Sequence, residues 1–440
     1  MVFQVGVSLS GETGIVRNMA FHPKIVKVDG LRVLLVPDDR QSVTVRVLVG
    51  TGSREEEIKD LGSAHFLEHF VFRGAKKYPY DIGEYVDQFG GLVDAYTSQE
   101  SISFMVKMGR ERLETAIDLV GQIVSEPLLP ADKISKEKRI IIEEIKFRDD
   151  DPQMRAVRGL WELMYQGCRL ARPLAGTYAT VRGMRVDKLS AYMEKWFVPG
   201  NTIVGIVGKW ESDEAVLGYI RQSFAGLLAR SGIVPKKDVY SEPGSDKARI
   251  RLIRRLKMKQ ATVVLGFRSF GVGHRLEVAR ILLNIIFGGG WFSRLFKEVR
   301  ENRGWAYSIG SWLEVLSDTG GVFVEAGLPK DNLARSVGLI KEIVFGLGER
   351  GKWAISQKDL DLAKECYKGR ISLKYDSPER VLGSALYDLM FEGRIYSATD
   401  LKKKAEAVTI TDIREVIETT LSEENLNLVV LGDYDKLPLR

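Results

Sequence analysis

The chain has 440 residues, 45% of them hydrophobic, so it is long enough for two or more domains with large buried cores. Its net charge of +6, from 65 basic and 59 acidic residues, is a small bias that argues against a nucleic-acid-binding protein. No run approaches the about 18 apolar residues of a membrane span. Two distant cysteines, Cys168 and Cys366, suggest no disulfide framework. The sequence therefore predicts a soluble, cytoplasmic protein with two buried, reduced thiols.

The first half of the chain predicts an α+β unit. Residues 25–37 predict a β-hairpin with Val28, Asp29 and Gly30 at its turn. Alternation of apolar and polar residues predicts further strands at 43–49, 92–97, 101–107 and 201–207. Helical periodicity predicts helices at 62–72, 82–89, 111–125 and 134–148.

The second half repeats this order after a segment that reads as a linker. Residues 231–247 contain Pro235 and Pro243 without a clear period, so we expect domains at 1–230 and 248–440. Strands are then predicted at 261–266, 306–314 and 321–326, and helices at 276–287 and 291–302. This repetition indicates duplication of one unit. Because Arg280 to Asn284 stand where the first copy has His65 to His69, the second domain is expected to be metal-free.

The run His65-Phe66-Leu67-Glu68-His69 is the H-x-x-E-H zinc pattern, and it holds two of only four histidines in the chain. Residues four apart share a helix face, so both imidazoles can reach one ion. Glu68 adjoins His69, where its carboxylate can address a metal-bound water without ligating. The alternative is a histidine pair that caps or packs a helix, but the rarity of histidine here favours a metal site.

A catalytic zinc ion needs a third protein ligand, which the helix around residues 137–145 can supply. Glu137 and Glu144 are seven positions apart and share a face, whereas Glu143 is rotated by about 100°. One of the pair would ligate while the other orients an imidazole. Surface glutamates on an amphipathic helix are the alternative.

Several segments match one known family in their spacing. They are Gly62 to Gly74, Gly90 to Glu100, Gly176-Thr177-Tyr178, Pro199-Gly200-Asn201, and Ser293-Arg294-Leu295-Phe296 through Tyr307-Ser308. The chain resembles the inverted-motif zinc peptidases, which include pitrilysin, insulin-degrading enzyme and the mitochondrial processing peptidase. It is most similar to their short bacterial and archaeal processing-peptidase-like members.

The resemblance implies a role for each matching residue. It makes His65, His69 and Glu144 the ligands of one zinc ion per chain, Glu68 the general base and Glu137 the carboxylate that supports a ligand. Arg300 and Tyr307 match the pair that engages substrate and supports the tetrahedral intermediate. The strand that would bind an extended substrate by β-augmentation contains Asp94, Ala95, Tyr96 and Thr97. Asp94 stands where the family usually has Asn, and Ala75 where a Thr is common.

The resemblance also implies an architecture. We expect an α+β fold of two homologous domains, each a mostly antiparallel sheet with packed helices, which together form half of a clamshell. A symmetric homodimer would then build two composite sites, with a heterodimer as the alternative.

The implied activity is zinc-dependent endopeptidase hydrolysis of short or unfolded peptides in an enclosed chamber, with Glu68 activating the water. A catalytically silent binding or scaffold subunit is the alternative, although the intact Glu68 argues against it. Hydrolysis of another amide or ester is a third possibility that the substrate strand argues against.

Overall fold

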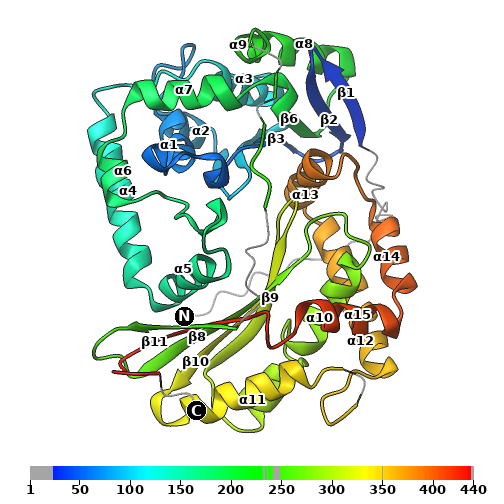
Figure 1. Ribbon diagram of the computed structural model, residues 1–440. Helices are drawn as coiled ribbons and strands as arrows, with labels where there is room; N and C mark the ends of the chain where they lie inside the picture. The colour runs from blue at the N-terminus through cyan, green and yellow to red at the C-terminus, as the bar shows by residue number, and fades with distance from the viewer. Residues whose placement is uncertain (1–22, 231–232, 235, 241–247, 349, 438–440) are drawn as a thin grey trace, which may run out of the picture.

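The computed structural model describes all residues except 1–22, 231–232, 235, 241–247, 349 and 438–440. It contains two halves, each built on one β-sheet with helices packed against it (Figure 1). Much of the predicted linker, at 231–232, 235 and 241–247, lies outside the described residues. The part of it that is described, 233–234 and 236–240, contains no helix or strand.

The first sheet has six strands in the order β1-β2-β6-β3-β5-β4. The strands are β1 (Lys24–Val28), β2 (Leu31–Pro37), β3 (Ser42–Val49), β4 (Leu92–Thr97), β5 (Ile102–Gly109) and β6 (Thr202–Gly208). Only β2 and β6 pair in parallel. The predicted hairpin is confirmed, because Asp29 and Gly30 join β1 to β2 with φ angles of 48° and 89°. Two successive positive φ values are typical of the tight turns that match the twist of a hairpin.

The described part of the first half contains the four predicted helices and five helices that were not predicted. They are α1 (Ser63–Phe70), α2 (Ile82–Asp87), α3 (Leu113–Ser125), α4 (Ile134–Asp150), α5 (Pro152–Met164), α6 (Tyr178–Arg182), α7 (Val186–Trp196), α8 (Asp213–Ser223) and α9 (Ala225–Leu228). The helix predicted at 62–72 is α-helical only to Phe70 and then tightens into a 3₁₀ turn, Val71–Arg73.

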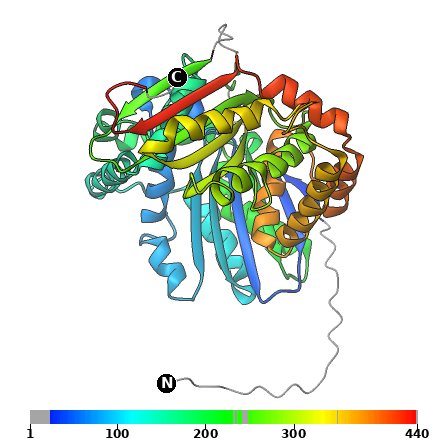
Figure 2. The same ribbon diagram turned by 90° about the horizontal axis from the view of Figure 1, so that it is seen from below.

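The second sheet has five strands in the order β7-β11-β8-β10-β9, of which only β7 and β11 pair in parallel. The strands are β7 (Arg249–Arg254), β8 (Gln260–Ser269), β9 (Ser308–Val315), β10 (Gly320–Pro329) and β11 (Leu426–Gly432). Its helices are α10 (Glu277–Phe287), α11 (Leu333–Phe345), α12 (Gln357–Tyr375), α13 (Pro378–Phe391), α14 (Ala398–Ala407) and α15 (Ile410–Thr420). In both views α12, α14 and α15 gather on one side of the molecule (Figures 1 and 2).

The helix predicted at 291–302 differs from the structure. Residues 291–293 form an irregular turn after three glycines, and the regular part is a short π-helix, Phe296–Glu301. The Asn302 amide donates to the Lys297 carbonyl, five residues back, which is the wide hydrogen-bond pattern of this helix type. Periodicity alone does not distinguish this winding from an α-helix.

The strand orders show that one topology occurs twice. The order β2-β6-β3-β5-β4 corresponds to β7-β11-β8-β10-β9, with the single parallel pair at the same place. Helix α10 lies between β8 and β9 as α1 lies between β3 and β4. The expected fold class, two α+β domains with mostly antiparallel sheets, is therefore confirmed.

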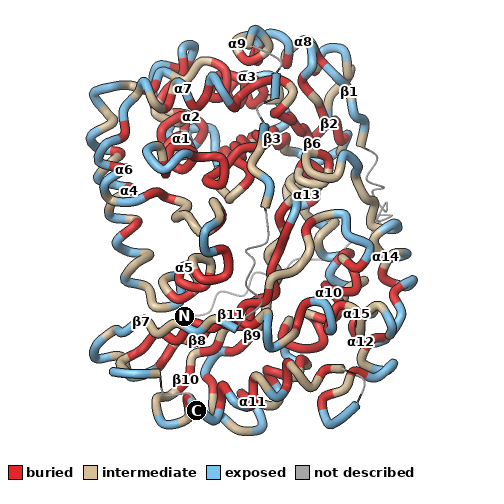
Figure 3. The backbone as a smooth tube through the Cα atoms, viewed as in Figure 1, coloured by how far each residue is buried: buried red, intermediate tan, exposed pale blue. Residues whose placement is uncertain are grey.

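Each half also covers the sheet of the other with one helix. On α5, Leu160 and Met164 pack into a cluster with Val264 and Val429 of the second sheet. Reciprocally, α13 packs its buried leucines against the first sheet in a cluster that contains Leu34 and Ile203 of that sheet and Leu382, Leu386 and Leu389 of the helix. Buried segments follow the central strands of both sheets, whereas these two helices bury only the residues that face a sheet (Figure 3). The exchange joins the two halves through apolar contacts on both sides.

The cysteines and the membrane-span prediction can be compared with the fold. Cys168 and Cys366 are free thiols, but both are only half-buried, because one lies in the turn after α5 and the other at the margin of a core on α12. In the part of the chain that the structure describes, no helix has the length and apolarity needed to cross a membrane.

Candidate metal centre

Helix α1 presents both motif histidines on one face. The ring centroids of His65 and His69 are 4.8 Å apart, and His65 is buried. The start of α1 is fixed by the buried Glu56, whose two carboxylate oxygens accept hydrogen bonds from the Gly62 and Ala64 amides at 2.7 Å each. These bonds satisfy backbone donors that the first turn of a helix leaves free. The short motif helix is therefore held in place by a carboxylate outside it.

Helix α4 brings Glu144 to both imidazoles. Oε1 of Glu144 is 3.5 Å from Nε2 of His65, and Oε2 is 3.4 Å from Nε2 of His69. The three side chains offer ligand atoms that all lie within 4.8 Å of one another. Oε2 of Glu144 is buried and makes no hydrogen bond within the described residues. Two imidazole nitrogens and one carboxylate are the ligand set of a catalytic zinc site, which leaves a fourth position open. The residues present thus fit a zinc ion.

Glu137 lies behind His69 and does not face the ligand atoms. Its Oε1 is 3.1 Å from Nδ1 of His69, and its Oε2 accepts a hydrogen bond from Nε of Arg73 at 2.9 Å. Arg73 also pairs with Asp81 at 2.9 Å. With Nδ1 held in this way, Nε2 of His69 is directed toward Glu144. The residue pattern alone left open which glutamate would ligate. In the structure, Glu144 faces both Nε2 atoms, whereas Glu137 faces Nδ1 of His69.

Neighbouring charges shift the pKa values of His69 and Glu144 in opposite directions. Burial by itself would lower the pKa of His69, but the hydrogen bond to Glu137 and the adjacent Glu144 carboxylate outweigh it and raise the pKa to about 9. Burial would raise the pKa of Glu144, yet the neighbouring His65 and His69 imidazoles and the Arg148 charge hold it well below its usual range. Before metal binds, the His69 imidazole is thus a cation that the Glu137 and Glu144 carboxylates hold.

Glu68, on the same helix, faces β4, the strand predicted to bind substrate. It accepts a hydrogen bond from the Thr97 hydroxyl at 2.5 Å. Because Thr97 is the last residue of β4, this bond links the candidate base directly to the edge of the first sheet.

The four predicted substrate-strand residues point to two different faces. β4 is the outermost strand, and among the residues that the structure describes it pairs only with β5, which leaves its other edge free there. Ala95 and Thr97 face the core and α1, while Asp94 forms an ion pair with Arg46 at 3.4 Å on the opposite face. Tyr96, two positions from Asp94, lies under the same guanidinium. Alternation along a strand explains the division.

The second half holds the other two predicted residues. Arg300 is at the end of the π-helix, with its guanidinium carbon 5.9 Å from the centroid of the Tyr307 ring and 4.9 Å from that of Phe296. Tyr307 is 78% exposed. Within the described residues, no hydrogen bond or ion pair joins either side chain to the metal-binding set.

Two residues of the centre were missed by the sequence analysis. Arg73 anchors Glu137, and Arg148 contacts Oε1 of Glu144 at 2.5 Å. Arg148 had a signal, since it lies four positions after Glu144 on a helix, a spacing at which opposite charges meet. Arg73 lies within the matched segment, but its partner comes from another helix.

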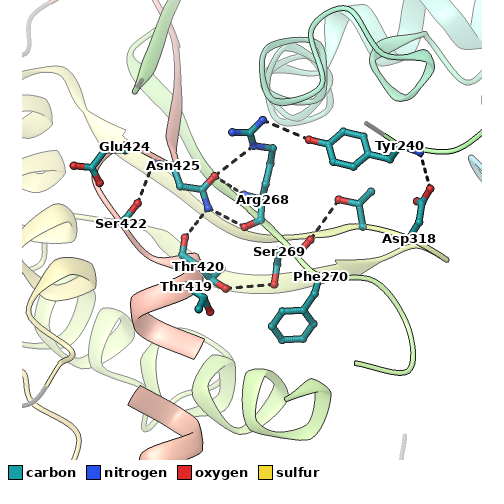
Figure 4. Close-up of a pocket in the computed structure, with 11 residues that line it drawn as sticks. Tyr240, Arg268, Ser269, Phe270, Asp318, Thr419, Thr420, Ser422, Glu424 and Asn425 are labelled. Carbon is teal, nitrogen blue, oxygen red and sulfur yellow. Dashed lines mark hydrogen bonds between the residues drawn. The ribbon is translucent and has the colours of Figure 1, made fainter. Parts of the chain in front are cut away.

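A polar cavity that is separate from the metal centre lies in the second half (Figure 4). It has a volume of about 530 Å³ and contains Arg268, whose backbone and side chain are both bonded to Asn425. Asp318 and Tyr240 close one end through a 2.7 Å hydrogen bond. None of its lining residues belongs to the metal centre.

Comparison with protein families places this site in a known context. The model described as "Insulinase (Peptidase family M16)" matches residues 32–178, which include α1 and α4. The model described as "Peptidase M16 inactive domain" matches residues 184–366, which include α10. The chain therefore belongs to peptidase family M16, as the motif resemblance implied.

Individual relatives support the same conclusion along nearly the whole chain. It is similar to the "Uncharacterized zinc protease YmxG" of Bacillus subtilis (27% identity over 400 residues, 90% of this chain and 95% of that protein). It is also similar to the "Uncharacterized zinc protease Rv2782c" of Mycobacterium tuberculosis (29% identity over 397 residues, 89% of each). Both relatives are named as zinc proteases, in agreement with a residue set that fits a zinc ion.

Solved structures share the fold. A protease from Helicobacter pylori superposes with a TM-score of 0.85 at 21% identity, covering 94% of this chain and all of that one. A peptidase M16 inactive domain from Pseudomonas fluorescens superposes with a TM-score of 0.84 at 19% identity, covering 95% and 100%. At these identities the likeness concerns the fold alone.

Proposed function

We propose that the protein is a zinc-dependent endopeptidase that hydrolyses short or unfolded peptides. The observation that carries the proposal is the placement of Glu68. It adjoins the convergent set His65, His69 and Glu144 and is bonded to Thr97 at the free edge of β4. A ligand set, a base and a strand edge suited to an extended backbone thus occur together.

The substrate would lie along β4 as an additional strand. Its backbone would form hydrogen bonds with the free edge of β4. Because these bonds use main-chain groups, this binding mode is open to peptides of any sequence. Ala95 and Thr97 face the α1 side, so a peptide on this edge would pass the Glu68 carboxylate. Asp94 replaces the usual Asn, but its carboxylate is held by Arg46 on the other face, away from Glu68.

The chain's own residues then carry the chemistry. A zinc ion held by His65, His69 and Glu144 would polarise the scissile carbonyl and lower the pKa of a water molecule to about 7. Glu68 accepts the proton of the attacking water and returns it to the leaving amine. Thr97 holds the Glu68 carboxylate in position through its 2.5 Å hydrogen bond. Glu137 and Arg73 hold the His69 ring.

Arg300 and Tyr307 would complete the site from a second subunit. A symmetric homodimer, enclosing a chamber, would place the second domain of one protomer opposite the metal centre of its partner. Two observations support this arrangement: the exposure of Tyr307, and the lack of a contact with the histidines within the described residues of one chain. There these side chains would stabilise the oxyanion. A heterodimer is the alternative.

The silent scaffold predicts a different outcome from the same fold. A scaffold would retain the metal centre without turnover. The Glu68–Thr97 hydrogen bond has no role in binding metal, so a scaffold would not need it. A hydrolase for another amide or ester would share the ligands and base. It would gain nothing from a free strand edge.

The test compares wild type with Glu68→Gln on an internally quenched, unstructured peptide, with the zinc content of both assayed. We expect zinc near one per chain in both proteins and loss of about 10²-fold or more of turnover in the variant, because the general base is removed. His65→Ala serves as the control that loses the metal. Zinc in both proteins with cleavage in neither would contradict the proposal and favour the scaffold.

A further inference from the structure

The polar cavity of about 530 Å³ in the second half is not used by the proposed peptidase chemistry. Its lining residues come from the end of β8, the β9–β10 turn, the connection from α15 to β11, and Tyr240 (Figure 4). We propose that this cavity binds a small organic anion that carries a carboxylate or a phosphate group, with Arg268 as the charged partner. Because none of the lining residues belongs to the metal centre, this site is additional to the endopeptidase.

Arg268 brings a positive charge to the cavity. In the part of the chain that the structure describes, no aspartate or glutamate pairs with its guanidinium, whose contacts are with neutral groups. Its Nε is 3.5 Å from the Asn425 side-chain oxygen, and one terminal nitrogen is 3.4 Å from the Tyr240 hydroxyl. Both distances are at the long limit for a hydrogen bond. A guanidinium has several donors in a planar fork, so Arg268 retains donors for parallel hydrogen bonds to an oxyanion.

A second arginine lies behind the cavity wall. Arg280 is fully buried and donates hydrogen bonds to the Ser269 hydroxyl at 3.1 Å and to the Phe270 carbonyl. Ser269 and Phe270 both line the cavity. Burial lowers the pKa of Arg280 to about 10, so it is still charged at neutral pH, and two of its nitrogens make no hydrogen bond within the described residues. A buried cation without an ionic partner is costly, and an anion in the cavity would offset part of that cost.

Hydroxyl groups supply further donors beside Arg268. The Ser422 hydroxyl accepts a hydrogen bond from the Asn425 amide at 3.2 Å, and its own proton has no acceptor among the described residues. The Ser269 and Thr420 hydroxyls are 3.5 Å apart, and a bond between them uses only one of their protons. A guanidinium with hydroxyl donors around it matches a carboxylate or phosphate group. The cavity volume is in the range of sites for small organic ligands, so a single inorganic ion would not fill it.

The two acidic residues that line the cavity leave the region around Arg268 open to an anion. Figure 4 shows Asp318 at one end and Glu424 at the other, with Arg268 between them. Both carboxylate oxygens of Asp318 accept hydrogen bonds from Arg54, at 2.8 and 2.5 Å, so this charge is already paired. Glu424 is exposed, and its charge is screened by solvent.

The test is isothermal titration calorimetry of the zinc-loaded protein with malate, glucose 6-phosphate and glucose. We expect one saturable site per chain for malate or for glucose 6-phosphate. Glucose should not bind, because it lacks the charge that Arg268 would pair with. The anion that binds more tightly shows whether a carboxylate or a phosphate is the preferred group.

A matched pair of arginine variants locates the site. Arg268→Gln should weaken anion binding by about ten-fold or more, because charged hydrogen-bond donors are lost. Arg254→Gln removes an exposed arginine of the same sheet, paired with Asp435 at 2.8 Å, and should leave the affinity unchanged. Thr419 is exposed and lines the cavity, so Thr419→Trp should block it and also weaken binding by about ten-fold or more.

The outcomes are separate from those of the peptidase test, because no peptide is cleaved in this experiment. Saturable binding of neither anion by wild type would overturn the cavity proposal. Equal affinities of Arg268→Gln and Arg254→Gln would also overturn it, since an anion held by the metal would bind both variants alike. If Arg268→Gln does not fold, undiminished binding by Thr419→Trp would have the same meaning.

Discussion

At the scale of single residues, Glu137 and Glu144 lie on the same helix face but have different partners. Glu144 lies between the two Nε2 atoms, whereas Glu137 binds Nδ1 of His69 and the Arg73 guanidinium. Burial alone would raise the pKa of Glu137, but these two hydrogen bonds lower it, so the carboxylate is charged where it fixes the imidazole.

We expect Glu137→Gln to weaken zinc affinity by about 10–100-fold, because His69 loses the charged partner that orients its ring. Competition with a zinc-binding dye measures the change. Glu143→Gln is the control, since Glu143 is on the same helix but is 69% exposed and pairs only with Lys146. Equal affinities of both variants would show that Glu137 has no role at the metal centre.

At the scale of elements, α1 depends on groups outside itself. It has only eight residues, too few for an isolated helix to be stable. Glu56 caps two of its amides from the preceding loop, and the helix packs Phe66 and Phe70 into the first core. The motif histidines are therefore positioned by a carboxylate several residues before them.

Glu56→Ala should lower the free energy of unfolding by about 2 kcal/mol or more, because two buried amides lose their acceptors. Urea unfolding of the metal-free protein measures this change. Glu57→Ala is the matched control, because its carboxylate is exposed and pairs only with Arg169 on the surface. If both variants unfold at the same urea concentration, the capping role is wrong.

At the scale of the whole molecule, a buried ion-pair cluster joins the halves beside β4. Arg54 is 1% exposed and pairs with Glu100 at 2.7 Å and with Asp318 of the β9–β10 turn at 2.5 Å. Glu100 also accepts hydrogen bonds from the Ser317 amide and hydroxyl. Together with the exchange of α5 and α13, this cluster fixes the second half against the loop that follows β4. The division at 1–230, 231–247 and 248–440 stays a prediction.

Replacing Arg54 by Ala should destabilise the protein by about 3–5 kcal/mol, because it leaves the buried Glu100 carboxylate without its cation. Arg40→Ala, which removes a more exposed arginine paired with Asp38, should cost at most about 1 kcal/mol. Denaturant unfolding monitored by tryptophan fluorescence compares the two variants. A similar small loss in both would mean that the cluster does not hold the halves together.

Much of this arrangement follows from local patterns, and the rest does not. The hairpin at Asp29 and Gly30 and the histidine face of α1 were predictable, because turn chemistry and helical spacing act over a few residues. The choice between Glu137 and Glu144 needed the position of α1 against α4. The packing of α5 on the second sheet was not predictable, because it joins elements that are about a hundred residues apart in the chain.

The most direct test of the central claim is product analysis by mass spectrometry of an unstructured peptide incubated with zinc-loaded, chelator-treated and zinc-restored protein. The account predicts cleavage at internal bonds, its loss when zinc is removed and its return with about one zinc ion per chain. Internal cleavage that persists without metal would contradict it. So would a zinc-loaded protein that leaves the peptide intact.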